Sequence, residues 1–468
     1  MSDKKLSRRD FMKMAGTVAS GVVLAGCAKA TEAPVASEAP PATQAPAPTA
    51  VPTKGPASGN VVVMHSIQQG ELTQDMVTQF QTKYPGITIE LVEVDLVRFF
   101  SMYAAGNPPD LVRVQAPSVP QYLARKMLYD LTPYFNASTV LKPNDLAPAN
   151  MYYQATDPLH VGSGNIYGMC KDWSPDFTLF EYKKAFEDKN IPLPSTTEPM
   201  TYQKIYDLGM QLAAFDGDRI TMFGFDTANG GAWTDRIWMN ILAETGDFLY
   251  SEDYSKIVLS GSEKTQKVIQ YFYDLVKNKL CAAGAIVPSP NWQGDDFDKG
   301  LVAQLQYGYW FSAMAETDVT TGQVLFIPAP TWTGVRRDPT MTATGMIMSA
   351  ATKVPDAAWQ VFQWYNGEEP AEARASSGWG VPALISWYPK MPNETPFQQQ
   401  VQTVLKGELD LNSSPLQFNP YIGESTVSNA YMLYLEQAIA GSISFEEMLK
   451  NIEFDVNTAI DDGKAAIG

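Results

Sequence analysis

The order of apolar and polar residues between positions 61 and 114 predicts a strand, a helix and two more strands. Residues 61–64 are all apolar, as in a buried strand, and residues 87–91 alternate apolar and polar side chains. Between these strands, Leu72, Met76, Phe80 and Tyr84 recur at every fourth position, as on one face of a helix. A strand, a helix and a strand with short connections form a parallel pair, so we expect a parallel sheet. Residues 110–114 predict its third strand.

Three later helices are predicted from the same spacing. The sequence Ser-Gly-Ser-Glu at 260–263 has the form of a capping box and predicts the start of the first helix. Pro355 predicts the start of the second, and Val427, Tyr431 and Ala438 share one face of the third. Strand and helix signals alternate over some 400 residues, which is too many for one core. We therefore predict an α/β protein with two lobes.

The composition changes sharply before residue 61. Arg8 and Arg9 precede an uncharged run from 14 to 25, and Cys27 follows the small residues Ala25 and Gly26. A helix needs roughly 20 apolar residues to cross a membrane, so this shorter run is typical of a twin-arginine export signal with a lipobox cysteine. We predict a signal peptide over 1–27, lipidation of Cys27, and a disordered tether over 28–60, which is rich in Ala, Pro and Thr. The protein would then be lipid-anchored at the extracytoplasmic face of the membrane.

Charge and residue counts exclude several classes of function. The chain has 51 acidic and 34 basic residues, a net charge of −17, which argues against binding to nucleic acid. It has two histidines and no H-E-x-x-H, G-x-S-x-G or G-x-x-x-x-G-K-[ST] motif, so we expect no metal, no cofactor and no histidine-dependent triad. We expect Cys170 and Cys281 to be buried thiols. Two carboxylates of a glycoside hydrolase stay open as an alternative.

The segment Ala-Ala-Gly-Asn-Pro-Pro-Asp-Leu-Val at 104–112 resembles a hallmark of the family 1 extracellular solute-binding proteins. These are the sugar receptors of ABC importers and relatives of maltose-binding protein. Two positions depart from the family pattern: Cys170 replaces a proline, and Tyr182 replaces an asparagine. Further blocks resemble the family in order and spacing, at 164–168, 179–186, 191–194, 358–365 and 378–383.

The resemblance implies the type II periplasmic-binding-protein fold, with two parallel-sheet α/β lobes joined by hinge crossovers. It places lobe 1 at 61–171 plus 332–373, and lobe 2 at 172–331 plus 374–468. It also implies a monomeric receptor that encloses a mono- or oligosaccharide between the lobes and passes it to a membrane permease without catalysis. A polyamine or peptide ligand stays open, because acidic and aromatic residues are abundant.

A sugar-binding cleft needs flat aromatic rings against the C–H faces of the sugar and polar groups around its hydroxyls. The resemblance suggests Trp310, in Gly-Tyr-Trp at 308–310, as a ring that faces the ligand, and an acid near Asp172. Ligands of parallel sheets lie at the carboxyl ends of the strands, which adds the loops at 65–70 and 115–118. The full set of candidates for ligand binding is Trp310, Trp233, Trp379, Asp172, Trp173, Gln115, Gln69, Ser118, Asp235, Arg236, Trp292, His65 and Tyr421.

Overall fold

The computed structural model describes most of the chain beyond the predicted tether. The predicted signal peptide and its lipidation site, Cys27, lie outside the described residues, and so does the tether as far as residue 56. Within the described part, no helix is both long and apolar enough to cross a membrane. The described ranges are 57–227, 233–289, 291–411 and 415–467.

The first lobe is built around a five-stranded sheet with the order β2-β1-β3-β13-β6. β2 and β3 both run parallel to β1, as the strand–helix–strand pattern predicts. β13 comes from a distant part of the chain and pairs antiparallel with both β3 and β6. The strands are β1 (Gly59–His65), β2 (Ile87–Glu93), β3 (Leu111–Val114), β6 (Gly168–Cys170) and β13 (Gly345–Met348).

The first strand begins earlier than the sequence pattern predicts. Gly59 and Asn60, which the prediction placed in the tether, already pair with Ile87 and Thr88 of β2. Backbone hydrogen bonds to a neighbouring strand hold these residues although neither side chain is apolar. The tether, as predicted, is therefore two residues too long.

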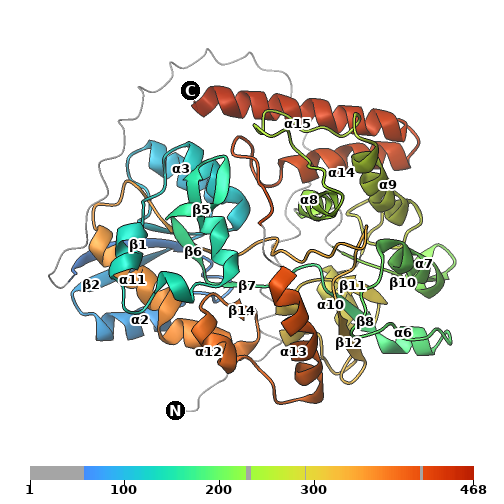
Figure 1. The fold of residues 1–468 in the computed structure, drawn as a ribbon, viewed down its shortest axis with the longest axis horizontal. Helices are drawn as coiled ribbons and strands as arrows, with labels where there is room; N and C mark the ends of the chain where they lie inside the picture. The colour runs from blue at the N-terminus through green and yellow to red at the C-terminus, as the bar shows by residue number, and fades with distance from the viewer. Residues whose placement is uncertain (1–56, 228–232, 290, 412–414, 468) are drawn as a thin grey trace, which may run out of the picture.

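Helices cover the first sheet on both sides (Figure 1). α2 begins after Thr73, whose side-chain oxygen accepts a hydrogen bond from the backbone nitrogen of Met76. The predicted helix at Pro355 is α11, and its Trp364 packs against Phe80 of α2 with ring centroids 4.9 Å apart. The helices of this lobe are α2 (Gln74–Lys83), α3 (Leu96–Ala104), α4 (Val119–Ala124), α5 (Thr132–Ala137), α11 (Pro355–Gly367) and α12 (Glu369–Ser377).

The second lobe contains a three-stranded sheet with the order β11-β8-β12. Its strands pair antiparallel, which differs from the parallel second sheet implied by the resemblance. Parallel pairing survives there as single bridges between Phe223 and Val302 and between Asp226 and Leu305. The strands are β8 (Leu179–Tyr182), β11 (Gln304–Gln306) and β12 (Val324–Ile327), and small hairpins elsewhere are β4 (Gln154–Asp157) with β5 (His160–Ile166) and β9 (Ala214–Asp216) with β10 (Arg219–Met222).

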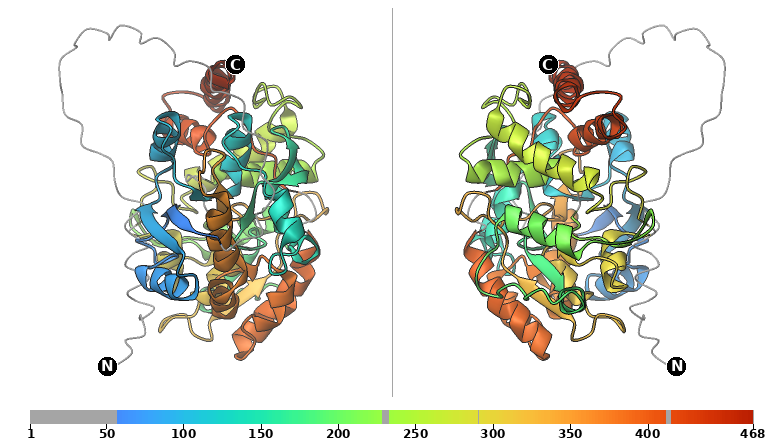
Figure 2. Two further views of the ribbon diagram at one scale, coloured as in Figure 1. Left: turned by 90° about the vertical axis from the view of Figure 1, so that its left-hand side faces the viewer. Right: turned by 90° about the vertical axis from the view of Figure 1, so that its right-hand side faces the viewer.

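The second lobe contains eight helices of the described chain; α10 and α13 pack against its sheet, whereas α14 and α15 pack together along one edge of the molecule (Figures 1 and 2). α9 begins two residues later than predicted, because Ser262 caps it by accepting from the backbone nitrogen of Thr265. Ser260 instead donates to Glu453 of α15. These helices are α6 (Lys183–Glu187), α7 (Tyr202–Leu212), α8 (Thr234–Glu244), α9 (Glu263–Lys277), α10 (Gln293–Asp298), α13 (Pro396–Glu408), α14 (Thr426–Ile439) and α15 (Phe445–Ile467).

The chain crosses between the lobes beside a buried carboxylate. Asp176 accepts hydrogen bonds from the Ser174 hydroxyl (2.6 Å), the Thr340 hydroxyl (3.0 Å) and the backbone nitrogen of Met341 (2.6 Å). These bonds join the first crossover, which contains Ser174 and Asp176, to the second crossover, the segment with Thr340 and Met341 that leads to β13. A third crossing pairs β7 (Asp172–Trp173) with β14 (Val381–Pro382) in antiparallel register.

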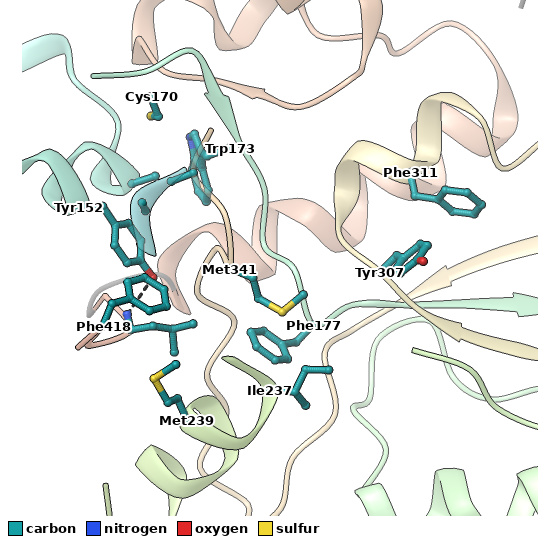
Figure 3. Packing of buried hydrophobic residues seen from close by; sticks show 14 of the residues in the cluster. Tyr152, Cys170, Trp173, Phe177, Ile237, Met239, Tyr307, Phe311, Met341 and Phe418 are labelled. Atoms are coloured by element: carbon teal, nitrogen blue, oxygen red, sulfur yellow. Dashed lines mark hydrogen bonds between the residues drawn. The ribbon is translucent and has the colours of Figure 1, made fainter. Parts of the chain in front are cut away.

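Apolar side chains fill the space between the crossovers and α8 (Figure 3). Phe177, Ile237 and Met341 come from three separate segments, and all three are buried. Close by, the Tyr152 hydroxyl donates to the Thr340 carbonyl (2.8 Å) and accepts from the backbone nitrogen of Leu416 (2.8 Å). The lobes therefore meet through a packed core and directed hydrogen bonds. Cys170 and Cys281 are also buried, as expected.

We predict that replacing Glu181 by Gln stabilises the protein, and more so at high pH. Glu181 lies in β8 with no exposed surface, opposite Gln304, and neither carboxylate oxygen has a hydrogen-bond partner among the described residues. Burial raises the pKa of Glu181 well above its usual value. The folded state therefore keeps a proton that the unfolded chain releases, so stability falls as the pH rises from the unfolded pKa toward the folded one.

Each pH unit in that interval costs about 1.4 kcal/mol, and glutamine at position 181 removes this cost. Denaturant unfolding at pH 5 and pH 8 measures the effect, with the exposed Glu187→Gln as the control. The gain in unfolding free energy for Glu181→Gln should be larger at pH 8. Equal gains at the two pH values would contradict a neutral buried carboxyl.

Candidate functional site

Five aromatic residues form a continuous cluster in the second lobe, and we call it the aromatic cluster: Trp233, Trp292, Tyr307, Trp310 and Trp379. Trp292 and Tyr307 stack with centroids 5.7 Å apart, and Trp292 and Trp310 stack at 6.0 Å. Trp379 contacts Trp310 at 5.8 Å, and Trp233 meets Tyr307 edge to face at 6.3 Å. Four of the predicted tryptophans are therefore neighbours in space, although 146 residues separate the first from the last.

Gly308 places Trp310 beside the first crossover. A Cβ atom at Gly308 would lie 2.1 Å from both the Asp176 carboxylate and the Ser174 hydroxyl, so only glycine leaves room for these two side chains. The next residue, Tyr309, donates its backbone N–H to the Pro175 carbonyl (3.2 Å). The short 3₁₀ helix η4 (Tyr309–Ala313) starts there and carries Trp310 at its beginning.

Trp292 is held by the loop before α10. Its ring lies against Gly294, where a Cβ atom would be only 2.4 Å from the ring. Asn291 donates to the Asp296 carboxylate at 2.6 Å, and the Ser289 hydroxyl donates to the same side chain. The ring orientation is thus set by the local backbone and by a buried carboxylate.

The cluster combines accessible rings with nearby polar groups. Its four tryptophans are half-buried, whereas Tyr307 is buried at the centre. The Tyr307 hydroxyl donates to Gln293 (3.4 Å), and the neighbouring Asp295 is partly buried, which raises the pKa of that carboxyl. Flat apolar faces with amide and carboxyl groups at the edge suit a ligand that has C–H faces and hydroxyl edges.

Arg236 connects this cluster to the first lobe. It lies in the first turn of α8, which begins directly after Trp233, and only 1% of its surface is exposed. Its Nη1 atom donates to the Gln115 side chain (3.3 Å) and to the Met341 carbonyl (3.1 Å), and its Nη2 atom donates to Glu424 (3.0 Å). Gln115 follows β3 at the carboxyl end of the first sheet. The aromatic cluster therefore lies next to the boundary between the lobes.

The family model for bacterial extracellular solute-binding proteins matches residues 65–372, which is well over half of the chain. The chain belongs to this family. Solved structures show the same fold at low sequence identity. The ABC substrate-binding protein Lmo0181 from Listeria monocytogenes, in complex with cycloalternan, has a TM-score of 0.68 and 18% identity. That match covers 86% of this chain and 99% of the Listeria chain.

Two further structures are similar to this solute-binding protein. Maltose-bound MalE3 from T. maritima has a TM-score of 0.66 and 17% identity, and the match covers 86% of this chain and 100% of that one. A solute-binding protein from Agrobacterium vitis S4 with bound D-mannitol has a TM-score of 0.65 and 16% identity. It covers 87% of this chain and 99% of its own. The type II two-lobed fold expected from the resemblance is confirmed.

Three predicted residues of the solute-binding protein lie in the first lobe and the crossover and are not members of the aromatic cluster. His65 is fully buried, its Nδ1 atom accepts from the Ser66 nitrogen, and burial lowers its pKa to about 3. Trp173 is buried and donates its indole N–H to the Pro382 carbonyl (3.2 Å). Asp172 pairs with Lys171, 2.6 Å away. These contacts engage all three side chains with neighbouring groups of the protein around the crossover.

The remaining candidates make local contacts. Gln69 accepts from the Ser66 hydroxyl at 2.9 Å, and Ser118 is buried. Asp235 accepts from Ser428 at 3.4 Å, and burial raises its pKa to about 6. The ring of Tyr421 lies 5.3 Å from the ammonium group of Lys464 on α15. Across the part of the chain that the structure describes, no group of three His, Cys, Asp or Glu side chains is placed to hold a metal ion.

Sequence reasoning did not select Tyr307 or Glu424, although both hold the site together. Tyr307 joins three tryptophans, and Glu424 pairs with Arg236. Tyr307 lies directly before Gly308 in the same short segment as Trp310, which is a signal that the sequence does contain. Glu424 lies 188 residues from Arg236, so no local pattern relates them.

We predict that Arg236→Met weakens the contact between the lobes. The change removes the hydrogen bonds to Gln115 and the Met341 carbonyl and leaves Glu424, which is partly exposed, without its cation. Loss of one partner of a largely buried pair should lower the unfolding free energy by about 2 kcal/mol. Denaturant unfolding measures this loss, and small-angle X-ray scattering should show a larger radius of gyration.

The control is Arg219→Met, which removes an ion pair to Asp216 with both side chains about three-quarters exposed. Such a pair contributes little, so both measurements should match the unchanged protein. If Arg236→Met behaved like this control, Arg236 would not hold the lobes together.

Proposed function

We propose that this solute-binding protein captures a carbohydrate between its lobes and delivers it to the permease of an ABC importer. The aromatic cluster is the observation that carries this proposal, because it presents half-buried indole rings beside the boundary between the lobes. The C–H faces of a sugar ring pack on such surfaces, and its hydroxyls need the amide and carboxyl groups nearby. The complexes of similar proteins with cycloalternan, maltose and D-mannitol support a polyhydroxylated ligand.

We place the lobes at 61–171 plus 332–373 and at 172–331 plus 374–468. The strand order of the two sheets supports this division. β13 belongs to the first sheet, although it follows all three strands of the second sheet along the chain. A ligand that touches both lobes binds the closed form better than the open form, so it shifts the equilibrium toward closure. Arg236 and Gln115 already meet across that boundary and would take part in closure.

Binding without catalysis is part of the proposal. The chain lacks the short motifs of metal-dependent or nucleophilic hydrolysis, and the matched family consists of solute-binding proteins. The ligand should therefore leave the protein chemically unchanged. We also propose that the protein acts as a monomer, that a lipid anchor attaches it to the membrane, and that the permease subunits are its protein partners.

The decisive experiment is calorimetric titration of the purified protein with mono- and oligosaccharides, polyamines and peptides. A sugar should bind with one site per chain, and chromatography of the recovered sugar should find no shortened or transferred product. Saturable binding of a polyamine or peptide with no response to any sugar would overturn the carbohydrate assignment. Product formation that an Asp or Glu substitution abolishes would make the protein a glycoside hydrolase.

We predict that Trp310→Ala weakens sugar binding about thirtyfold, which corresponds to roughly 2 kcal/mol. The change removes the ring that contacts both Trp292 and Trp379. The matched control is Trp359→Ala in α11, where the indole packs against Tyr134 and Phe135 in the first lobe. This control should cost about 3 kcal/mol of stability and leave the Kd unchanged.

Calorimetry and thermal melting of both variants separate ligand contact from core packing. A large fall in the melting temperature of Trp310→Ala with an unchanged Kd would assign Trp310 to the core.

We predict that Cys27 carries a lipid in the mature protein. The small residues before Cys27 and the arginine pair at 8–9 motivate this expectation. Mass spectrometry of the membrane fraction should find an acylated N-terminal cysteine and no residue before it. Cys27→Ser should release the protein from the membrane. A mature chain that begins at Met1 would rule out both cleavage and anchoring.

A further inference from the structure

A small cavity lies where α12 packs against the crossover strands, and its lining includes Gly380, the residue that follows Trp379 of the aromatic cluster. Its volume is about 10 Å³, which is close to the smallest space that holds one water-sized particle. Its walls come from β7, from β14 and the residues after it, and from α11 and α12. Among the residues that line it are Lys171, Asp172, Asn366, Arg374, Pro382 and Trp387.

Arg374, which lines this cavity, is a cation without a carboxylate partner among the described residues. Its Nη2 atom donates to the Tyr365 carbonyl (2.8 Å), and its guanidinium lies 4.4 Å from the centre of the Tyr365 ring. The Nε and Nη1 atoms are buried and have no hydrogen-bond partner among the described residues. Within the same ranges, no carboxylate lies close enough to Arg374 to form an ion pair. Unpaired buried donors on a charged group are costly.

The neighbouring charges do not neutralise Arg374, because they already pair with one another. Lys171 contacts Asp172 at 2.6 Å and Glu71 at 3.7 Å. Arg113 contacts Glu71 at 3.0 Å. With three cations and two carboxylates, the group carries one excess positive charge.

Unpaired donors also outnumber unpaired acceptors here. His65 is neutral at physiological pH because burial lowers its pKa to about 3. Its Nδ1 atom accepts from Ser66, so the proton is on Nε2, which is buried without a partner in the described structure. Three donor atoms without partners, Nε and Nη1 of Arg374 and Nε2 of His65, compare with one acceptor without a partner, the Asn366 side-chain oxygen. The neighbourhood lacks negative charge and acceptors.

We propose that this cavity is a binding site for one small monovalent anion, of which chloride is the representative. The anion accepts hydrogen bonds from Nε and Nη1 of Arg374 and balances the excess charge of the group. Because the cavity joins α12 to β7 and β14, the bound anion stabilises the first lobe against the crossover. None of the five residues of the aromatic cluster lines this cavity, and the proposal does not depend on the carbohydrate site.

The test compares thermal melting of the purified protein in sodium chloride, sodium bromide and sodium gluconate at equal ionic strength. Gluconate is too large for the cavity, so chloride and bromide should raise the melting temperature saturably, by on the order of 2 °C. Arg374→Met keeps the aliphatic stem, removes the charge and should abolish the difference between the salts. The control Arg98→Met lies on the exposed surface of α3 and should keep the full difference.

Crystals grown in bromide supply a second measurement that needs no variant. An anomalous scattering peak next to Arg374 is expected. Absence of that peak would overturn the proposal and leave a water molecule as the occupant. Equal melting in all three salts, or an unchanged halide effect in Arg374→Met, would overturn it as well.

Discussion

The insertion of β13 between β3 and β6 determines how the two lobes are joined. All four residues of β13 are buried, and the strand pairs on both sides with segments that precede it by more than 170 residues. Gly345 makes this possible, because a Cβ atom there would lie 2.1 Å from the Met169 carbonyl. Once β13 is in place, the chain must leave and return to the first sheet along neighbouring paths. The first two crossovers therefore run side by side, and the segment that carries Trp310 contacts the first of them.

Buried carboxylates give the crossovers their fixed arrangement. Asp176 accepts three hydrogen bonds from the first two crossover segments. Asp338 accepts one from the backbone nitrogen of Phe177 at 2.7 Å. Burial raises the pKa of Asp176 to about 6, and burial together with the nearby Glu408 raises that of Asp338. Polar contacts of this kind are costly to desolvate but depend strongly on direction. They specify which backbone groups meet at the crossover, whereas apolar packing alone would permit several registers.

The same arrangement brings the aromatic cluster to the boundary between the lobes. Gly308 allows the backbone before Trp310 to lie against Ser174 and Asp176 of the first crossover. Trp233 lies before α8, whose Arg236 reaches Gln115 in the first lobe. A ligand held on the tryptophans would therefore lie close to groups from both lobes. This proximity is what a receptor that closes around its ligand requires.

The sequence by itself determined the local elements and the aromatic character of the candidate site. Periodic apolar positions predicted β1, β2, α2, α11 and α14, because each pattern reflects one element packing on one core. Tryptophans beside glycines, together with Trp292 in a proline-rich stretch, supplied four members of the aromatic cluster. Only the tertiary structure decided that Tyr307 links them, that Glu424 pairs with Arg236, and that His65 and Trp173 are core residues. Those outcomes depend on contacts between segments far apart in the chain, where side-chain burial and pairing follow from packing rather than from local spacing.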